Sequence, residues 1–449
     1  MDVSHNRLWL RTVACCALAL IVAGCLSGCI RRTDVGEGGK KITRVSIAYW
    51  GGQNEVVLVE KIISKFEKLN PDIRVTRVHI TGDYSAKLGT MMAANRGPDV
   101  FYVMSGDTFD YLHRGVMRDI APYIKKSKVV HYDDYYLETV RQFKQGDKIY
   151  ALSWDWSPCV VFYNKTFFDE AGVPYPKEDW TWSDFLETAK KLTVRDKRGR
   201  VQRYGTLSAP GWVWWHWVLQ NGGTNFNSTL DRCMFDSPEA IEAQQFEYDL
   251  TNKYHVAPAP GDPEADNAIY FLSGKTAMVF SYRWFITFLE GLDRWEWAVA
   301  PSPRGKVRAT MSGSVGFAMS SRCKHPKAAW RLIEYLCGPV GQAGYVDALW
   351  GVPTLKKLST EVKRFEVPGH PEYNYRVFAE ETKYAKVALA SPYISDQQFY
   401  TICKRERDKL FLGRQSVKET LRSITRQTNA IIDANKKEMA EREAAGGRR

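Results

Sequence analysis

Short apolar runs alternate with helical periodicities along the first part of the chain. The apolar runs cover residues 45–49, 73–78 and 99–103, and residues spaced three and four apart recur over 59–66 and 88–92. The first pattern predicts strands and the second predicts helices. Asn70-Pro71 and Gly97-Pro98 end the two helices, because proline does not continue a helix. Strands that alternate with helices predict a sheet of mainly parallel strands.

The rest of the chain repeats this organisation. A continuous apolar run over 160–163 predicts another buried strand, and Thr181 is placed to cap a helix that continues to Leu192. His325-Pro326 opens a further helix, and a charged helix is expected over 417–440. The fold class expected from the pattern is α/β, with mainly parallel sheets flanked by helices.

Residues 1–29 have the layout of a secretory signal. Arg7 and Arg11 precede an apolar run over 13–22, and small residues follow. The run is too short to span a bilayer as a permanent helix. We therefore expect the mature protein to lie in the periplasm or on the cell surface.

Two short segments near the end of this signal are similar to the lipidation motif of bacterial lipoproteins. Leu26-Ser27-Gly28-Cys29 matches the motif better than Val22-Ala23-Gly24-Cys25, so Cys29 is the expected lipidated residue and Cys25 the alternative. Residues 30–41, rich in Gly and charge, then form a flexible tether between the lipid anchor and the folded part. An ordinary cleaved signal without lipid stays open.

Length and charge limit the function classes. A chain of 449 residues is too long for one core and favours two lobes. The net charge is +12, but the Lys and Arg residues are scattered, and nucleic acid is an unexpected partner for an exported protein. The charge gives an acidic solute a weak preference over a neutral one.

Cysteine usage argues against a disulfide scaffold or a structural zinc site. Removal of the signal and lipidation of Cys29 leave an odd number of cysteines and no C-x-x-C pair. One or two disulfides stay open. The remaining cysteines are Cys159, Cys233, Cys323, Cys337 and Cys403.

Motifs for catalysis or cofactor binding are incomplete or missing from the sequence. Ser273-Gly274-Lys275-Thr276 resembles the end of a phosphate-binding loop, but Ile269 stands where that loop needs glycine. We interpret the segment as a turn before a strand. No zinc-binding H-E-x-x-H or serine-nucleophile G-x-S-x-G occurs. We expect no cofactor, no metal and no enzymatic activity.

Aromatic and small residues gather where the predicted strands end, which is where open α/β sheets bind ligands. Indole faces cover the C–H surface of a sugar ring, and polar side chains pair with its hydroxyls, so these residues indicate a carbohydrate site. The candidates are Trp50, Gly52, Gln53, Ser105, Gly106, Trp154, Asp155, Trp214, Trp215, Arg283, Trp284, Gly313, Ser314 and Trp350.

The sequence resembles the family 1 extracellular solute-binding proteins, the maltose-binding-like components of ABC importers. The similar segments occur in order from about Ile42 to Leu355. They include Gly97-Pro98-Asp99-Val100-Phe101, Phe162-Tyr163-Asn164-Lys165, Gly274-Lys275-Thr276-Ala277-Met278 and Ser312-Gly313-Ser314-Val315-Gly316-Phe317.

The resemblance implies two α/β lobes that close on a solute between them. The first lobe would comprise 42–157 and 303–348, and the second 158–302 and 349–449. Crossings between the lobes are expected near 154–158, 301–305 and 349–353. The family's ligand loops correspond to Trp50, Gly52, Gln53, Ser105, Gly106, Trp154, Asp155, Trp284, Gly313 and Ser314.

Some candidate residues have no support from the resemblance. Trp214 and Trp215 rest on the aromatic argument alone. Arg283 lacks a firm counterpart in the family, so it could pair with a carboxylate of the ligand or with a residue of a lobe.

The family implies a monomer that delivers a mono- or oligosaccharide to membrane permease subunits. Two other functions share the same sequence features, a lipoprotein enzyme acting on glycans and a sugar-sensing binding module.

Overall fold

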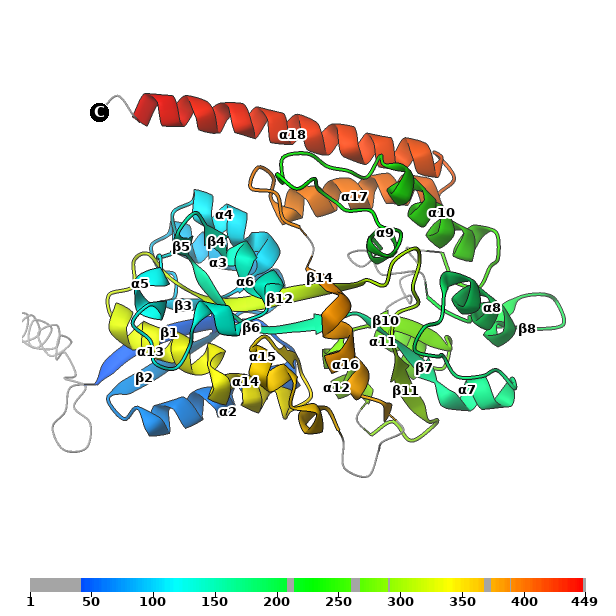
Figure 1. Ribbon diagram of the computed structural model, residues 1–449, viewed down its shortest axis with the longest axis horizontal. Helices are drawn as coiled ribbons and strands as arrows, with labels where there is room; N and C mark the ends of the chain where they lie inside the picture. Colours follow the sequence, from blue (N-terminus) through cyan, green and yellow to red (C-terminus); the bar gives the residue numbers. More distant parts are fainter. Residues whose placement is uncertain are drawn as a thin grey trace, which may run out of the picture.

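The computed structural model describes residues 42–207, 214–259, 267–289, 291–366, 373–387 and 389–446. The signal over 1–29, with Cys25 and Cys29, and the tether over 30–41 lie outside the described residues. Figure 1 shows two lobes side by side, with the long strands β6 and β12 running between them. Among the described residues, no helix has both the length and the apolar character that crossing a membrane requires.

The larger sheet forms the first lobe and extends into the hinge. Its order is β13-β6-β12-β3-β1-β2, and β14 pairs with β12. Strands β1, β2 and β3 are parallel neighbours, whereas β12 runs antiparallel to β3 and β6. The strands are β1 (Thr43–Tyr49), β2 (Ile73–His79), β3 (Val100–Met104), β6 (Ala151–Pro158), β12 (Thr310–Met319), β13 (Val352–Pro353) and β14 (Ala385–Val387).

Helices cover this sheet, and their apolar faces build one core with it. Val59, Ile63 and Phe66, which define the helical period in the sequence, are fully buried on α2. The helices are α2 (Gln53–Leu69), α3 (Tyr84–Ala93), α4 (Thr108–His113), α5 (Ala121–Ile124), α6 (Leu137–Val140), α13 (Pro326–Cys337), α14 (Pro339–Val346) and α15 (Lys356–Ser359).

The second lobe has a smaller sheet with the order β10-β7-β11. Both pairings are antiparallel, so the expectation of mainly parallel sheets is wrong for this lobe. Apolar content predicts that a strand is buried but carries no information about its direction. The strands are β7 (Val160–Asn164), β10 (Met278–Ser281) and β11 (Trp297–Ala300), and a short hairpin pairs β8 (Val194–Arg195) with β9 (Val201–Arg203). A similar hairpin, β4 (Lys144–Gln145) with β5 (Lys148–Ile149), belongs to the first lobe.

Two buried clusters of apolar side chains form the core of the second lobe. Thr181 caps α8 as expected, because its side chain accepts the Asp184 N–H and its own N–H donates to the Asp184 carboxylate at 2.8 Å. The helices are α7 (Lys165–Glu170), α8 (Trp182–Leu192), α9 (His216–Gln220), α10 (Pro238–Asn252), α11 (Asn267–Leu272), α12 (Ile286–Leu289), α16 (Arg376–Glu381), α17 (Asp396–Phe411) and α18 (Val417–Gly446).

The crossings between the lobes lie close to two of the three expected places. Strand β6 continues into β7, and β13 pairs with β6 through Val352 and Pro353. The expected crossing at 301–305 is wrong, since the carbonyls of Pro301 and Arg304 accept hydrogen bonds from Trp180 and Trp182 of the second lobe. The crossing is β12 itself, which pairs with first-lobe strands along most of its length.

The lobe boundaries remain a prediction. Leu355 and Leu358, which the sequence assigned to the second lobe, pack in the core of the first lobe. The five cysteines of the folded part are buried, and none of them forms a disulfide among the described residues.

Candidate functional site

A cavity of about 410 Å³ lies between the lobes. The first lobe supplies the end of β3 and the turn η2 (Ser105–Asp107), the second lobe supplies the start of α9 and α17, and β12 forms the part between them. The lining residues are Met104, Gly106, Asp107, Trp214, Trp215, Met311, Ser312, Gly313, Asp396, Gln397, Phe399, Tyr400 and Cys403. Four separate parts of the chain therefore meet at one recess, as a site between closing lobes requires.

Two adjacent indoles form the aromatic wall of the cavity. Trp214 is held from behind by Arg407, whose guanidinium carbon lies 4.5 Å from the ring centre. Arg407 in turn forms a buried bidentate ion pair with Glu247, at 2.7 and 3.1 Å. The indole N–H of Trp215 donates to the sulfur of Met311 on β12. Both rings therefore have fixed positions, and the half-buried Trp215 offers a ligand more surface than Trp214, which is 3% exposed.

His216, next to these indoles, holds β12 in place. Its Nδ1 accepts the backbone N–H of Met311 at 3.1 Å, and its Nε2 faces the side-chain amide of Gln220 at 2.7 Å. Burial lowers the pKa of His216 to about 3, so the imidazole is neutral at physiological pH. The residue has a structural role at the cavity wall.

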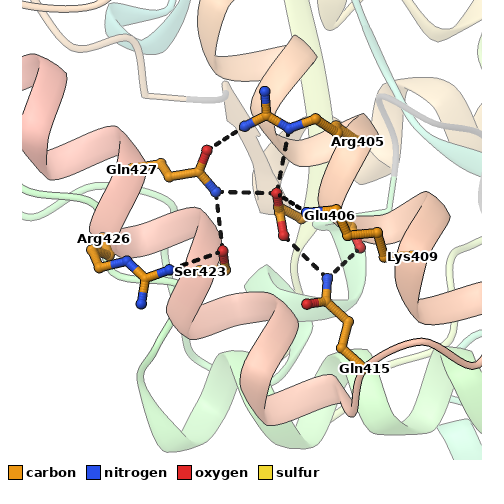
Figure 2. Close-up of polar contacts among 7 residues, drawn as sticks. All are labelled: Arg405, Glu406, Lys409, Gln415, Ser423, Arg426 and Gln427. Carbon is orange, nitrogen blue, oxygen red and sulfur yellow. Dashed lines mark hydrogen bonds and ion pairs between the residues drawn. The ribbon is translucent and has the colours of Figure 1, made fainter.

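Helix α17 carries five of the lining residues, and α18 fixes its position. Figure 2 shows the buried carboxylate of Glu406 on α17 receiving hydrogen bonds from Lys409, Gln415 and Gln427, the last two at 3.1 Å. Burial alone would raise the pKa of Glu406, but these hydrogen bonds outweigh it and lower the pKa to about 2. Gln427 lies on α18, so the network joins the two helices.

The far end of α18 reaches the other lobe. His113 at the end of α4 contacts the sulfur of Met439 through its Nε2, at 3.2 Å. Figure 1 shows α18 running along one side of both lobes. The helix that holds α17 in the second lobe therefore also contacts the first lobe, next to the turn that lines the cavity.

Two carboxylates face the cavity from opposite lobes. Gly106 allows them to approach, because a Cβ atom added there would lie 1.4 Å from Oδ2 of Asp396. Burial, followed by the charges of Asp107 and Asp110, raises the pKa of Asp396 to about 7. Burial also raises the pKa of Asp107, although the hydroxyl of Ser85 donates to it at 3.0 Å.

A second pair of carboxylates lies at the first-lobe end of the crossing strands, outside the lining of the cavity. Burial raises the pKa of Glu55 to about 7 and that of Asp155 well above its usual range. The hydroxyl of Tyr345 donates to Glu55 at 3.3 Å. The charges of both carboxylates also act on the buried hydroxyl of Tyr102, which has no hydrogen-bond partner among the described residues.

Four residues expected at the ligand site line the cavity, namely Gly106, Trp214, Trp215 and Gly313. They come from both lobes and from β12, so residues far apart in the sequence are brought together. Ser105 lies in the same turn as Gly106. Its role stays a prediction.

Three of the expected ligand residues are instead part of the protein interior. Trp154 is 1% exposed and packs on Tyr102, Phe317 and Tyr345. The prediction of a ligand contact is wrong for this residue, because these aromatic rings occupy the space around its indole.

Ser314 and Arg283 are also wrong as ligand residues. The hydroxyl of Ser314 donates to the carbonyl of Thr139 at 3.0 Å and pairs with the hydroxyl of Ser153. The guanidinium of Arg283 is fully buried and donates to the carbonyl of Gly351 at 2.5 Å. Arg283 therefore ties the second lobe to the segment before β13, which decides the alternative that the sequence left open.

The other expected residues lie outside the cavity lining, and their roles stay predictions. Trp50 packs edge-on against Tyr84 and Tyr102 at 4.9 and 4.7 Å. Gly52 caps α2, whose first residue is the exposed Gln53. Two further positions are Trp284 and Trp350, which are half-buried at the edges of the cores.

Sequence reasoning missed all the lining residues of α17 and several residues next to the expected ones. Asp396, Phe399 and Tyr400 lie beyond Leu355, where the resemblance ends, and their spacing is that of an ordinary amphipathic helix. Asp107 directly follows the predicted Ser105-Gly106 pair, so proximity to that turn was the available signal. Within the described residues, no group of three or more His, Cys, Asp or Glu residues could hold a metal ion.

Comparison with known proteins places the chain among binding proteins. The family described as bacterial extracellular solute-binding protein matches residues 52–343. An uncharacterized lipoprotein of Streptomyces antibioticus is 25% identical over 357 residues, which cover 76% of each chain. The multiple sugar-binding protein of Streptococcus mutans is 22% identical and covers 68% of this chain and 74% of its own length.

The fold also matches solved structures. The ABC substrate-binding protein of Listeria monocytogenes in complex with cycloalternan superposes with a TM-score of 0.76 at 25% identity, covering 89% of this chain and all of that chain. The GacH receptor of Streptomyces glaucescens, solved unliganded and with acarbose, gives a TM-score of 0.74 at 19% identity over 88% and 99% of the chains. The expected two-lobe α/β fold is confirmed.

Proposed function

Because the chain belongs to the bacterial extracellular solute-binding proteins, we propose that it binds a carbohydrate between its lobes and delivers it to the permease of an ABC importer. The cavity with Trp214 and Trp215 carries this proposal. The half-buried indole of Trp215 can cover the apolar face of a sugar ring, while Asp396 and Gln397 can pair with its hydroxyls. The sugar-binding names of the relatives support the same class of solute.

Binding and closure are linked in this account. Residues of both lobes line the cavity, so a solute contacts all of them only when the lobes are closed. The solute therefore stabilises the closed conformation, which the permease then recognises. The protein acts as a monomer and releases the solute chemically unchanged, without a cofactor.

The test is a thermal-shift and titration-calorimetry screen against mono- and oligosaccharides, with amino acids and peptides as controls. A solute present at about 100 times its dissociation constant stabilises the folded protein by roughly 2.7 kcal/mol. Trp215→Ala should reduce the affinity for the tightest-binding saccharide by about tenfold or more, which corresponds to about 1.4 kcal/mol of binding free energy.

Trp182→Ala is the matched control for this experiment. Trp182 is half-buried in the same lobe and stacks on Phe246 at 4.5 Å, outside the cavity lining. Its substitution should lower stability without changing affinity. Binding of amino acids or peptides instead of saccharides, or equal losses in both variants, would contradict the proposal.

We also propose that Cys29, or alternatively Cys25, carries the lipid that holds the protein at the membrane outside the cytoplasm. The cysteine-containing motifs and the lipoprotein name of one relative support this anchor. Cys29→Ala should move the protein from the membrane fraction to the aqueous fraction, while Cys25→Ala should leave it attached. If both variants stay in the membrane fraction, neither Cys29 nor Cys25 is by itself the lipid anchor.

A further inference from the structure

The two carboxylates in the cavity belong to different lobes and approach each other across it. Asp107 ends the turn after β3, and Asp396 is the first residue of α17. The overlap of an added Gly106 Cβ with Asp396 shows that the carboxylate touches first-lobe backbone. Lobe closure thus places both acidic groups in one recess.

The carboxylate of Asp396 is left without a protein partner there. Asp396 is exposed, and its carboxylate accepts no hydrogen bond from a described residue. Asp396 is one of the residues that line the cavity. A cavity-lining carboxylate without a protein donor is free to accept hydrogen bonds from a ligand.

The charges around the cavity do not supply a compensating cation. Among the lining residues that the structure describes, two are acidic and none is Lys, Arg or His. The charge of Asp110 on α4 also acts on Asp396, although Arg114 and His113 partly offset it. The neighbouring Arg407 on α17 is already paired with Glu247.

Two ionised carboxylates in this cavity repel each other unless a positive charge lies near them. Burial raises the pKa values of both Asp107 and Asp396, and neighbouring carboxylates, Asp110 for both, raise them further. The closed cavity therefore binds either a proton or a cationic group. A cation held between the lobes would favour closure, because both carboxylates contact it only in the closed form.

The aromatic wall makes a sugar-borne ammonium group the best match. Indole faces attract cations and also cover the C–H faces of sugar rings. An ammonium group offers three N–H donors, enough to reach Asp107 and Asp396 together. We propose that the transported carbohydrate carries a protonated amine, which Asp107 and Asp396 bind from opposite lobes. This inference rests on the proposed function and specifies its substrate class.

The experiment is titration calorimetry at pH 7 on the full-length protein in detergent. The probes are amino sugars and glucosamine oligomers, each paired with the N-acetylated and the hydroxyl counterpart of the same linkage. Aminated sugars should bind at least tenfold more tightly than their neutral counterparts. Asp396→Asn should reduce that preference to less than threefold, while the affinity for neutral sugars stays within threefold of the wild type.

Asp408→Asn is the matched control, because Asp408 lies on the same helix, is exposed and pairs with Lys404. It should keep the full preference for amines, and Asp107→Asn should behave like Asp396→Asn. Neutral sugars that bind as tightly as aminated ones, or a preference that survives both cavity variants, would overturn this inference and leave the proposed function intact. If no saccharide binds, both proposals fail.

Discussion

Replacing Glu247 by glutamine tests how the aromatic wall of the cavity is held. The Glu247–Arg407 ion pair is bidentate at 2.7 and 3.1 Å, and the side chains are 0% and 7% exposed. Glu247→Gln preserves the shape of the side chain but leaves the buried guanidinium without a counter-charge. Breaking a buried pair in this way costs about 3–5 kcal/mol.

This cost translates into a measurable change in melting temperature. An unfolding entropy of about 2.1 cal/mol/K per residue over roughly 400 residues gives about 0.8 kcal/mol/K. The melting temperature should therefore fall by about 4–6 °C in Glu247→Gln, measured by calorimetry or circular dichroism at pH 7. Intrinsic tryptophan fluorescence should change as well, since Arg407 lies over the ring of Trp214.

Two further variants separate the buried pair from a general effect of charge. Asp408→Asn removes an exposed ion pair from the same helix and should lower the melting temperature by less than about 1 °C. Glu247→Gln combined with Arg407→Met should recover most of the loss, because no unpaired charge is then buried. A melting temperature for Glu247→Gln within 1 °C of the wild type would show that the buried ion pair does not stabilise the folded protein as predicted.

Three other outcomes follow from the cavity and its supports. Gly106→Ala should displace the carboxylate of Asp396, because the added Cβ would overlap it; calorimetry should show weaker solute binding than for Gly313→Ala, where an added Cβ meets no atom. Glu406 has a lowered pKa, so its contribution to stability should be present above about pH 4.5 and be lost as the pH falls toward 2; Glu406→Gln should lack this acid-dependent loss in melts at successive pH values. Asp396 has a raised pKa, so the protein without solute should lose stability as the pH rises from about 4 through 7, and an unchanged pH profile in Asp396→Asn would contradict the raised pKa.

Much of the fold could be predicted from the sequence because its signals are local. The spacing of apolar residues predicted α2, and the capping residue Thr181 predicted the start of α8. Both signals involve residues only a few positions apart in the sequence. Strand direction is a long-range property, so the antiparallel pairing of β7 with β10 was not visible in the sequence.

The site was only partly predictable, for a related physical reason. Trp214 and Trp215 were found because aromatic density is visible in sequence, whereas Asp396 belongs to the site only through the packing of α17 against the opposite lobe. Ser314 and Arg283 have residue types that suit a ligand. Their partners are backbone carbonyls that only the folded chain brings near.

The most direct test of a solute site between the lobes is a crystal structure of the protein with the tightest-binding saccharide from the screen. The account predicts the sugar in the cavity, with a ring against Trp214 or Trp215 and a polar group within hydrogen-bond distance of Asp396. A saccharide bound elsewhere on the protein, with this cavity filled by water alone, would contradict it.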